Sequence, residues 1–380
     1  MSNVAVSIER MLAGLWARIQ DSVETDVRSL AMVRVIFGVF ALLINPLSIG
    51  WLAGMPRALF NPQPMSIANW FPSFPSAATA AVIDGLLVVT AAYILLGIRT
   101  RLAAPLHALL LILGAGFQYA FGKIDHGMMF PVFLLLLSLT DWGTVFALLP
   151  DAPRGGTANR TAPAFLALLL CYGFFTAGVL KAAFWCDFDP DTGGFLQWFY
   201  NRGFFGSRAP LAGLVPRLPQ GAFEALDYGA VAFELAPLPM LLLGRRAWRC
   251  WILLACLFHL TTILLLDISF VTHMPVYLTF IPLDGVLRRL AGRRWAGPAA
   301  RWGTIGLVAA VTLWQLGEIA RGLDPVAPVE GLWNLVMPGN LYGIVMPSGL
   351  WACTAWAVAA SIRLPPSDRG QASRMGGPTS

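Results

Sequence analysis

The sequence predicts an all-α protein built as a polytopic bundle of about ten transmembrane helices. Of its 380 residues, 57 % are hydrophobic and only 12 % are charged, whereas about 25 % of the residues of a soluble domain are charged. Apolar runs of about 20 residues, the length that crosses a hydrocarbon core as a helix, recur along the chain. The alternating pattern of a membrane β-barrel is absent. A soluble enzyme or a nucleic-acid-binding protein is therefore excluded, despite the net charge of +6.

Each apolar run is expected to form one crossing. The fourth is interrupted by the residues 141–143, Asp-Trp-Gly. The eighth is short and contains Pro275 and Pro282, so it is expected to be broken or re-entrant, which would leave nine full crossings. The expected spans are 30–49, 80–97, 102–121, 127–149, 162–181, 224–244, 249–267, 271–287, 302–320 and 341–362.

The distribution of positive charge orients these spans. Most of the 26 basic residues fall in segments on the same side as the N-terminus, which predicts cytoplasmic termini and a multi-pass protein of the inner (cytoplasmic) membrane of a bacterium. Residues 1–29 form a cytoplasmic segment, in which 8–20 have the spacing of an amphipathic surface helix. Residues 30–362 form the membrane domain, with an extracytoplasmic segment at 182–223. The tail 363–380 is expected to be disordered.

Lysine is rare in this chain, because all but two of the 26 basic residues are arginines. Lys181 ends the fifth expected span on the outer side, and Trp185 follows it. In apolar surroundings a lysine can supply a neutral amine that acts as a general base, which an arginine cannot do. Interfacial anchoring beside Trp185 is an equally good interpretation. The other lysine, Lys123, is interpreted as a solvated partner of Asp125.

Further ionisable residues are expected in the outer half of the bundle, where a buried ionisable group is a functional candidate. We expect them to converge with Lys181 on one water-accessible cavity. Arg34 is expected to extend to the inner surface, and His107 to hydrogen-bond between helices. The five cysteines have no metal-binding spacing, so no metal site is predicted. The outer-half residues are Asp84, Asp125, His126, Glu234, His259, Asp267 and His273.

Three stretches together resemble the horizontally transferred transmembrane domain (HTTM) family, which includes the vitamin K-dependent γ-carboxylase. They are residues 29–42 with Arg34, residues 122–143 with His126, and residues 177–185, AGVLKAAFW, with Lys181. The stretches 234–237 and 258–259 also fit, so the similarity covers roughly residues 25–290.

The resemblance implies a lyase of the carboxylase and epoxidase kind. Lys181 would be the base that deprotonates a reduced quinone similar to vitamin K hydroquinone, and His126 would position the quinone. O2 and CO2 would be co-substrates, and a secreted peptide or protein would be carboxylated. From their expected place in the outer cavity, and not from the resemblance, Asp125, Trp185, Glu234, His259 and His273 are expected to bind the substrate. The chain differs in having Leu180 where the carboxylase has a second lysine. Only residues 363–380 follow the last expected span, so no large recognition domain is expected there.

Two other functions remain open. SdpB-like members of the same family are associated with maturation of secreted peptide toxins, so this chain would then modify or escort a peptide at the outer face. A transporter or a structural membrane partner is the third interpretation, in which Glu234 and His259 would form a midplane site. The lipid bilayer is the expected partner in all three, no nucleic acid is expected, and the sequence leaves the oligomeric state open.

Overall fold

The computed structural model describes residues 3–45, 47–121, 126–189, 193–202, 209–291, 298–323, 328–336 and 342–364. Within these ranges, seven helices are long and apolar enough to cross a membrane, and an eighth span results if one bent pair is counted. The described residues form no strand, only an isolated bridge between Ile98 and Leu149. The chain is therefore a helical protein of the multi-pass membrane type.

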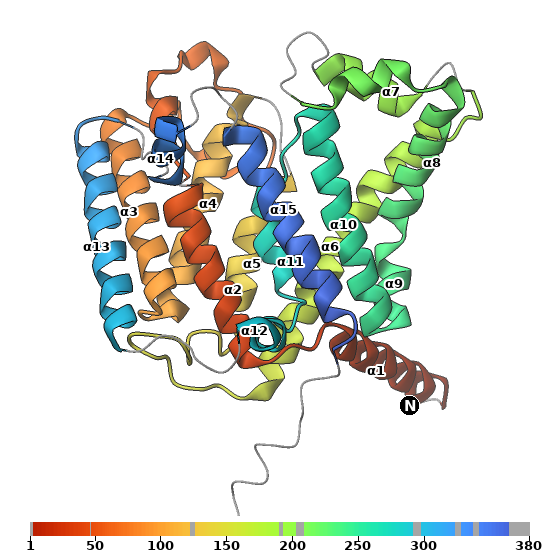
Figure 1. The fold of residues 1–380 in the computed structure, drawn as a ribbon, viewed down its shortest axis with the longest axis horizontal. Helices are drawn as coiled ribbons and strands as arrows, with labels where there is room; N and C mark the ends of the chain where they lie inside the picture. Colours follow the sequence, from red (N-terminus) through yellow and green to blue (C-terminus); the bar gives the residue numbers. More distant parts are fainter. Residues whose placement is uncertain are drawn as a thin grey trace, which may run out of the picture.

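The helices run mostly side by side along the bundle (Figure 1). Their bounds are α1 (Asn3–Val23), α2 (Val27–Val39), α3 (Ala77–Leu96), α4 (Thr100–Gln118), α5 (Met129–Leu137), α6 (Gly156–Trp185), α7 (Gly194–Arg202), α8 (Gln220–Leu235), α9 (Pro237–Leu243), α10 (Arg245–Leu266), α11 (Met274–Leu278), α12 (Leu283–Ala291), α13 (Pro298–Ala320), α14 (Pro328–Val336) and α15 (Tyr342–Ser361). Shorter helical turns include η1 (Phe40–Ile44), η2 (Gly50–Gly54), η6 (His126–Met128) and η8 (Val271–His273).

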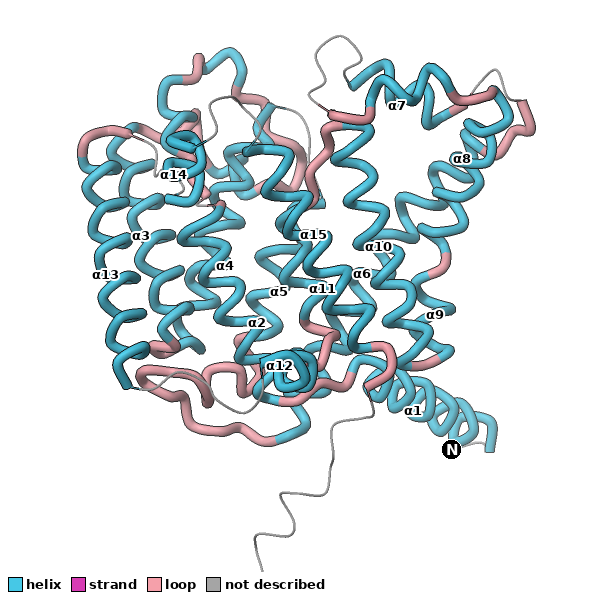
Figure 2. Tube along the Cα trace, viewed as in Figure 1, coloured by secondary structure: helices cyan, strands magenta, loops and turns pink. Residues whose placement is uncertain are grey.

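The bundle has two distinct ends. α1 and α12 lie at one end, which we call the α1 end, and α7 and α14 lie at the other, the α7 end (Figure 1). Figure 2 shows that the loops gather at these two ends, so the middle layer is helical. This arrangement satisfies backbone hydrogen bonds inside each helix, as a membrane interior requires.

The fourth expected span, 127–149, forms only the nine-residue helix α5. Hydroxyl groups end it, because Ser138 Oγ bonds to the carbonyl of Leu135 at 2.7 Å and Thr140 Oγ1 to that of Leu137 at 2.7 Å. Asp141 then fixes the following loop by accepting the backbone N–H of Arg154 at 2.8 Å. These side-chain bonds to the backbone compete with helix continuation.

Two other expected spans are interrupted at prolines. In 271–287, the five-residue α11 contains Pro275, and α12 begins just after Pro282. In 224–244, α8 and α9 are bent by 49° at a break before Pro237. A proline lacks the N–H that the helix needs, and its ring crowds the preceding turn.

Arg34 on α2 does not extend to the membrane surface as expected from its position. Its side chain is fully buried, and its five N–H groups donate to five backbone carbonyls. The acceptors are Ile94 at 2.6 Å, Leu95 at 3.1 Å, Trp142 at 3.1 Å, Val145 at 3.2 Å and Phe146 at 2.6 Å. One guanidinium thus ties the end of α3 and the 142–146 loop to α2.

A glycine makes room for this guanidinium at the end of α3. Gly97 caps the helix with φ = 69°, in the left-handed region that favours glycine. A Cβ atom there would lie 2.6 Å from Ala147 and 2.8 Å from Arg34 Nη1. The sequence Leu-Leu-Gly at 95–97 therefore ends α3 and leaves space for Arg34.

Two other buried polar residues have structural partners. Asp84 accepts Ser48 Oγ at 2.8 Å and the backbone N–H groups of Ile49 and Gly50 at 2.9 and 3.0 Å. His107 Nδ1 lies 2.7 Å from Thr90 Oγ1 on the adjacent helix α3, which is the interhelical hydrogen bond expected for this histidine. Asp84 therefore holds the start of η2 and lines neither of the two cavities described below.

We predict that Arg34→Lys lowers the thermal unfolding temperature of the detergent-solubilised protein. A lysine offers three donors where five carbonyls need partners, and each buried group left without one costs about 1–3 kcal/mol. The expected loss is at least about 2 kcal/mol. The control is Arg28→Lys, which changes an exposed arginine on the same helix. Equal unfolding temperatures for the two variants would contradict the role of Arg34.

Candidate functional site

Lys181 forms an ion pair with Glu234. Lys181 lies in the last turn of α6 and Glu234 in the last turn of α8, and Nζ donates to Glu234 Oε1. The lysine side chain is 23 % exposed and the glutamate side chain 5 %. Nζ also lies 5.0 Å from the centre of the Trp185 ring, at the distance of a cation–π contact. The ammonium therefore has one carboxylate and one aromatic face as neighbours.

A small residue brings these two helices together. Gly178 is one turn before Lys181, and a Cβ atom there would lie 3.0 Å from both Glu234 Cβ and Leu235 Cδ2. Such a distance is shorter than ordinary van der Waals contact. Gly178 thus allows the close packing of α6 on α8 that places Lys181 within hydrogen-bond reach of Glu234.

The bend after Glu234 is held by a side-chain bond. Pro237 has no N–H for the carbonyl of Phe233, four residues earlier. The indole of Trp251 on α10 donates to that carbonyl instead, at 3.2 Å. The Phe233 ring stacks on Trp251 with centroids 5.6 Å apart. The end of α8, and with it Glu234, is therefore fixed against α10.

The ion pair lies at the wall of a mainly apolar cavity of about 320 Å³. α6, α8 and α10 form its sides, and α7 contributes Phe195 and Trp198. The polar side chains in its lining besides the pair are Trp185, Trp198, Thr261 and Thr262. The lining residues are Lys181, Trp185, Phe195, Trp198, Ala225, Leu226, Gly229, Ala230, Glu234, Phe258, Thr261, Thr262, Leu265, Leu266, Ile268 and Phe270. We call this space the lysine cavity.

One oxygen of the Glu234 carboxylate is buried and has no hydrogen-bond partner among the described residues. Glu234 Oε1 accepts the bond from Lys181. Among the residues that the structure describes, no donor reaches the buried second oxygen, Oε2. A buried carboxylate oxygen without a donor is energetically costly.

Helix α7 is tied to α8 by a buried carboxylate. Asp227 accepts the backbone N–H groups of Gly194 and Phe195 at 2.6 and 2.7 Å. These are first-turn donors of α7, which an acidic group satisfies well.

The same acidic surroundings affect Cys186, just after α6. Desolvation and the carboxylates of Asp227, Glu224 and Asp187 raise the pKa of its thiol, which makes it a poor nucleophile.

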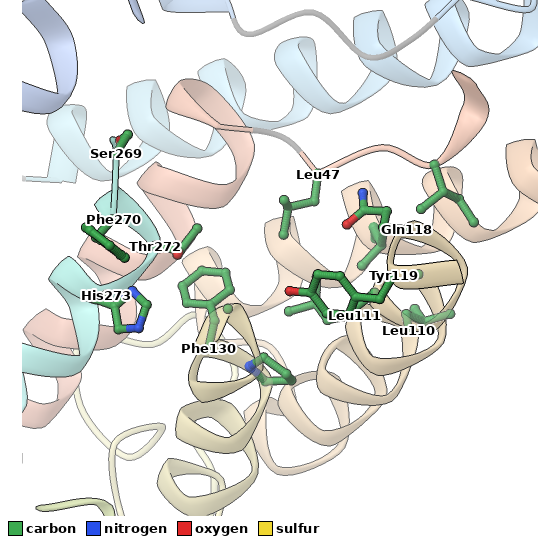
Figure 3. A pocket seen from close by; sticks show the side chains of 16 residues that line it. Leu47, Leu110, Leu111, Gln118, Tyr119, Phe130, Ser269, Phe270, Thr272 and His273 are labelled. Atoms are coloured by element: carbon green, nitrogen blue, oxygen red, sulfur yellow. The ribbon is translucent and has the colours of Figure 1, made fainter. Parts of the chain in front are cut away.

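A second cavity, of about 220 Å³, lies between α4, α5 and η8. Figure 3 shows His273 and Phe130 on one side and Tyr119 on the other, with the Tyr119 hydroxyl pointing toward Phe130. We call this space the tyrosine cavity. Its lining residues are Leu47, Ile49, Leu87, Leu110, Leu111, Gly114, Ala115, Gln118, Tyr119, Gly127, Phe130, Pro131, Ser269, Phe270, Thr272 and His273.

Phe270 lines both cavities. Its ring centre lies 4.7 Å from that of His259. The His259 side chain is buried and belongs to the lining of neither cavity, and its Nε2 lies 2.8 Å from the hydroxyl of Tyr277. His259 therefore packs against Phe270 and is not part of the lysine cavity.

The expected single cavity is thus divided in the structure. Lys181, Trp185 and Glu234 share the lysine cavity, whereas His273 lines the tyrosine cavity. Asp125 and the side chain of His126 lie outside the described residues, although the neighbouring Gly127 lines the tyrosine cavity. Asp267 ends α10 with φ = 54° and lines neither cavity.

Several lining residues had no place in the sequence expectations. Phe195 reaches the site because Asp227 fastens α7 to α8, which no local pattern indicates. On α8 a signal was present: Leu226, Ala230 and Glu234 recur every four residues, and Gly229 lies beside them. Small residues on the helix face that carries a buried glutamate leave space next to it.

Within the described ranges, no group of three or more His, Cys, Asp or Glu side chains could hold a metal ion. The fold and the site together define a multi-helix membrane-type protein with an ion pair facing an apolar cavity. Comparison with protein-family models, curated proteins and solved structures finds no match for this chain.

We predict opposite effects of alanine at two glycines of α6. Gly178→Ala should destabilise the protein by about 1 kcal/mol, because the added methyl group is crowded by Glu234 and Leu235. Gly173→Ala is the matched control, since its Cβ would meet only Met129 Cε at 3.9 Å. There the better helix propensity of alanine should stabilise by about 0.5–1 kcal/mol. Thermal unfolding in detergent measures both, and a stabilised Gly178→Ala variant would exclude the tight packing.

Proposed function

We propose that this chain is an integral-membrane enzyme in which Lys181 takes a proton from a hydroxyl group of a lipid-soluble substrate, a reduced quinone. The observation that carries the proposal is the Lys181–Glu234 pair at the wall of an apolar cavity. The resemblance of residues 177–185 to the HTTM family supports the same role for Lys181. It adds O2 and CO2 as co-substrates and a vitamin K-type quinol as the substrate class.

The pair gives the lysine a way to become a base. In water the charged pair is strongly preferred over the pair with the proton shifted to the carboxylate. Removal from water penalises two charges more than two neutral groups. Transfer of one proton from Nζ to Glu234 would thus supply a neutral amine without releasing a proton to solvent. The amine would take the substrate proton, and the resulting ammonium would stabilise the substrate anion.

The size and lining of the cavity favour a flat aromatic head group. About 320 Å³ is near the lower end of the range of about 300–1,000 Å³ found for small-molecule sites. Phe195, Trp198 and Phe258 offer ring faces against which such a group can pack. A hydroxyl of this head group would lie beside Lys181, the more exposed member of the pair. For His126 we keep the role of positioning the quinone, because its neighbour Gly127 lines the adjoining cavity.

The topology that we propose has ten crossings and both ends of the chain in the cytoplasm. α5 and the α11 segment would be short crossings that complete the count with the eight longer spans. The α1 end, which carries α1, α12 and the start of α10, would face the cytoplasm because arginines are abundant there. The lysine cavity, roofed by α7, would then open toward the extracytoplasmic side of the inner membrane.

The test is turnover of a chemically reduced naphthoquinone by the protein in liposomes, followed as O2 uptake and as epoxide formed. Lys181→Ala and Lys181→Arg should each lower the rate at least about 100-fold, because arginine keeps the charge but cannot act as a base. Glu234→Gln should also lower it, since an amide cannot receive the lysine proton.

The matched control is Lys123→Arg, which changes the only other lysine of the chain and should leave the rate unchanged. Full activity of Lys181→Arg would refute the base role. Solute transport that requires Glu234 but tolerates Lys181→Ala would instead favour the transporter interpretation.

A further inference from the structure

The α1 end contains a second polar site, separate from both cavities. A pocket of about 450 Å³ lies between α1, the α9–α10 junction and Leu364, just after α15. We call it the arginine pocket. Its lining residues are Arg18, Asp21, Ser22, Leu243, Gly244, Arg245, Arg246, Arg249 and Leu364.

The charges of this pocket are unbalanced. Of its four arginines, Arg245 pairs with Glu24 at 3.0 Å. The one acid in the lining, Asp21, is bound by Arg160 at 2.6 Å. No carboxylate pairs with Arg18, Arg246 or Arg249 in the part of the chain that the structure describes. The pocket therefore has an excess of positive charge.

Arg249 provides the independent indication of a ligand. Its side chain is only 2 % exposed, and Nη1 donates to the carbonyl of Ser361 at 2.7 Å. Its Nε is buried and has no hydrogen-bond partner among the described residues. A buried guanidinium donor without an acceptor is unfavourable, and an anion in the pocket that this side chain lines would relieve the cost.

The backbone adds donors at the same place. α10 begins at Arg245, its N-cap residue is Gly244, and no side chain caps it. The first N–H groups of a 22-residue helix thus lack side-chain acceptors, and the positive end of the helix dipole faces the pocket. Helix N-termini with flanking arginines bind phosphate groups well.

We propose that the arginine pocket binds the phosphate of an anionic phospholipid of the membrane leaflet at the α1 end. The neighbouring helix favours a lipid over free phosphate as the source. α1 exposes Val6, Ile8, Met11, Leu12 and Leu15, which suits a helix lying on a membrane surface. A headgroup in the pocket would have its acyl chains beside this apolar face. Basic pockets near the ends of transmembrane helices bind such headgroups.

The experiment uses the full chain in a neutral detergent and measures thermal unfolding and lipid binding by native mass spectrometry. Phosphatidylglycerol should raise the unfolding temperature and remain bound, whereas phosphatidylcholine should do neither. Arg246→Gln should weaken binding of phosphatidylglycerol about fivefold, the loss expected for one basic residue near an anionic lipid. Arg249→Gln should weaken it at least as much.

The matched control is Arg288→Gln, which removes an arginine that pairs with Asp284 on α12 at the same end. It should leave binding unchanged. Arg246 is exposed, so Arg246→Gln keeps the test valid if Arg249→Gln unfolds the protein. Equal binding by Arg246→Gln, or equal binding of phosphatidylcholine, would overturn the proposal. Equal stabilisation by inorganic phosphate at the same concentration would overturn the lipid assignment.

Discussion

The contact on which the rest of the bundle depends is the burial of Arg34 among five backbone carbonyls. The end of α3 and the 142–146 loop have carbonyl groups beyond the regular bonding of the helix, although that of Ile94 also accepts the N–H of Gly97 at 3.2 Å. A single guanidinium donates to five of these carbonyls, in a geometry that a flexible ammonium cannot reproduce. α2, α3 and the loop after α5 are thereby fixed to one another, and no carboxylate of the described residues pairs with Arg34.

Three other contacts fix the helices around the lysine cavity. Gly178 permits close packing of α6 on α8, and Trp251 satisfies the carbonyl that Pro237 leaves open. Asp227 then holds α7 in place. These contacts fix the helices around Lys181 and Glu234, and the space between the helices remains a cavity.

Much of the helical layout could be predicted from the sequence, because long apolar runs permit few structures in a membrane. The amphipathic helix predicted at 8–20 lies within α1, and the break predicted near Pro275 and Pro282 is present. The interruption predicted at 141–143 lies in the loop after α5, but the helix already ends at Leu137, because hydroxyl bonds to the backbone at Ser138 and Thr140 decide its end. The burial of Arg34 depends on carbonyls more than 50 residues away in sequence. The same limit applies to Lys181 and Glu234, whose contact requires the packing at Gly178.

Phe270 lines both cavities. A molecule that moved this residue from one side would change the volume and shape available on the other. Thermodynamic linkage makes such an influence mutual: the free energy with which one occupant alters the binding of the second equals the effect in reverse. Phe270, whose ring packs 4.7 Å from that of His259, is therefore the residue through which occupancy of one cavity would affect the other.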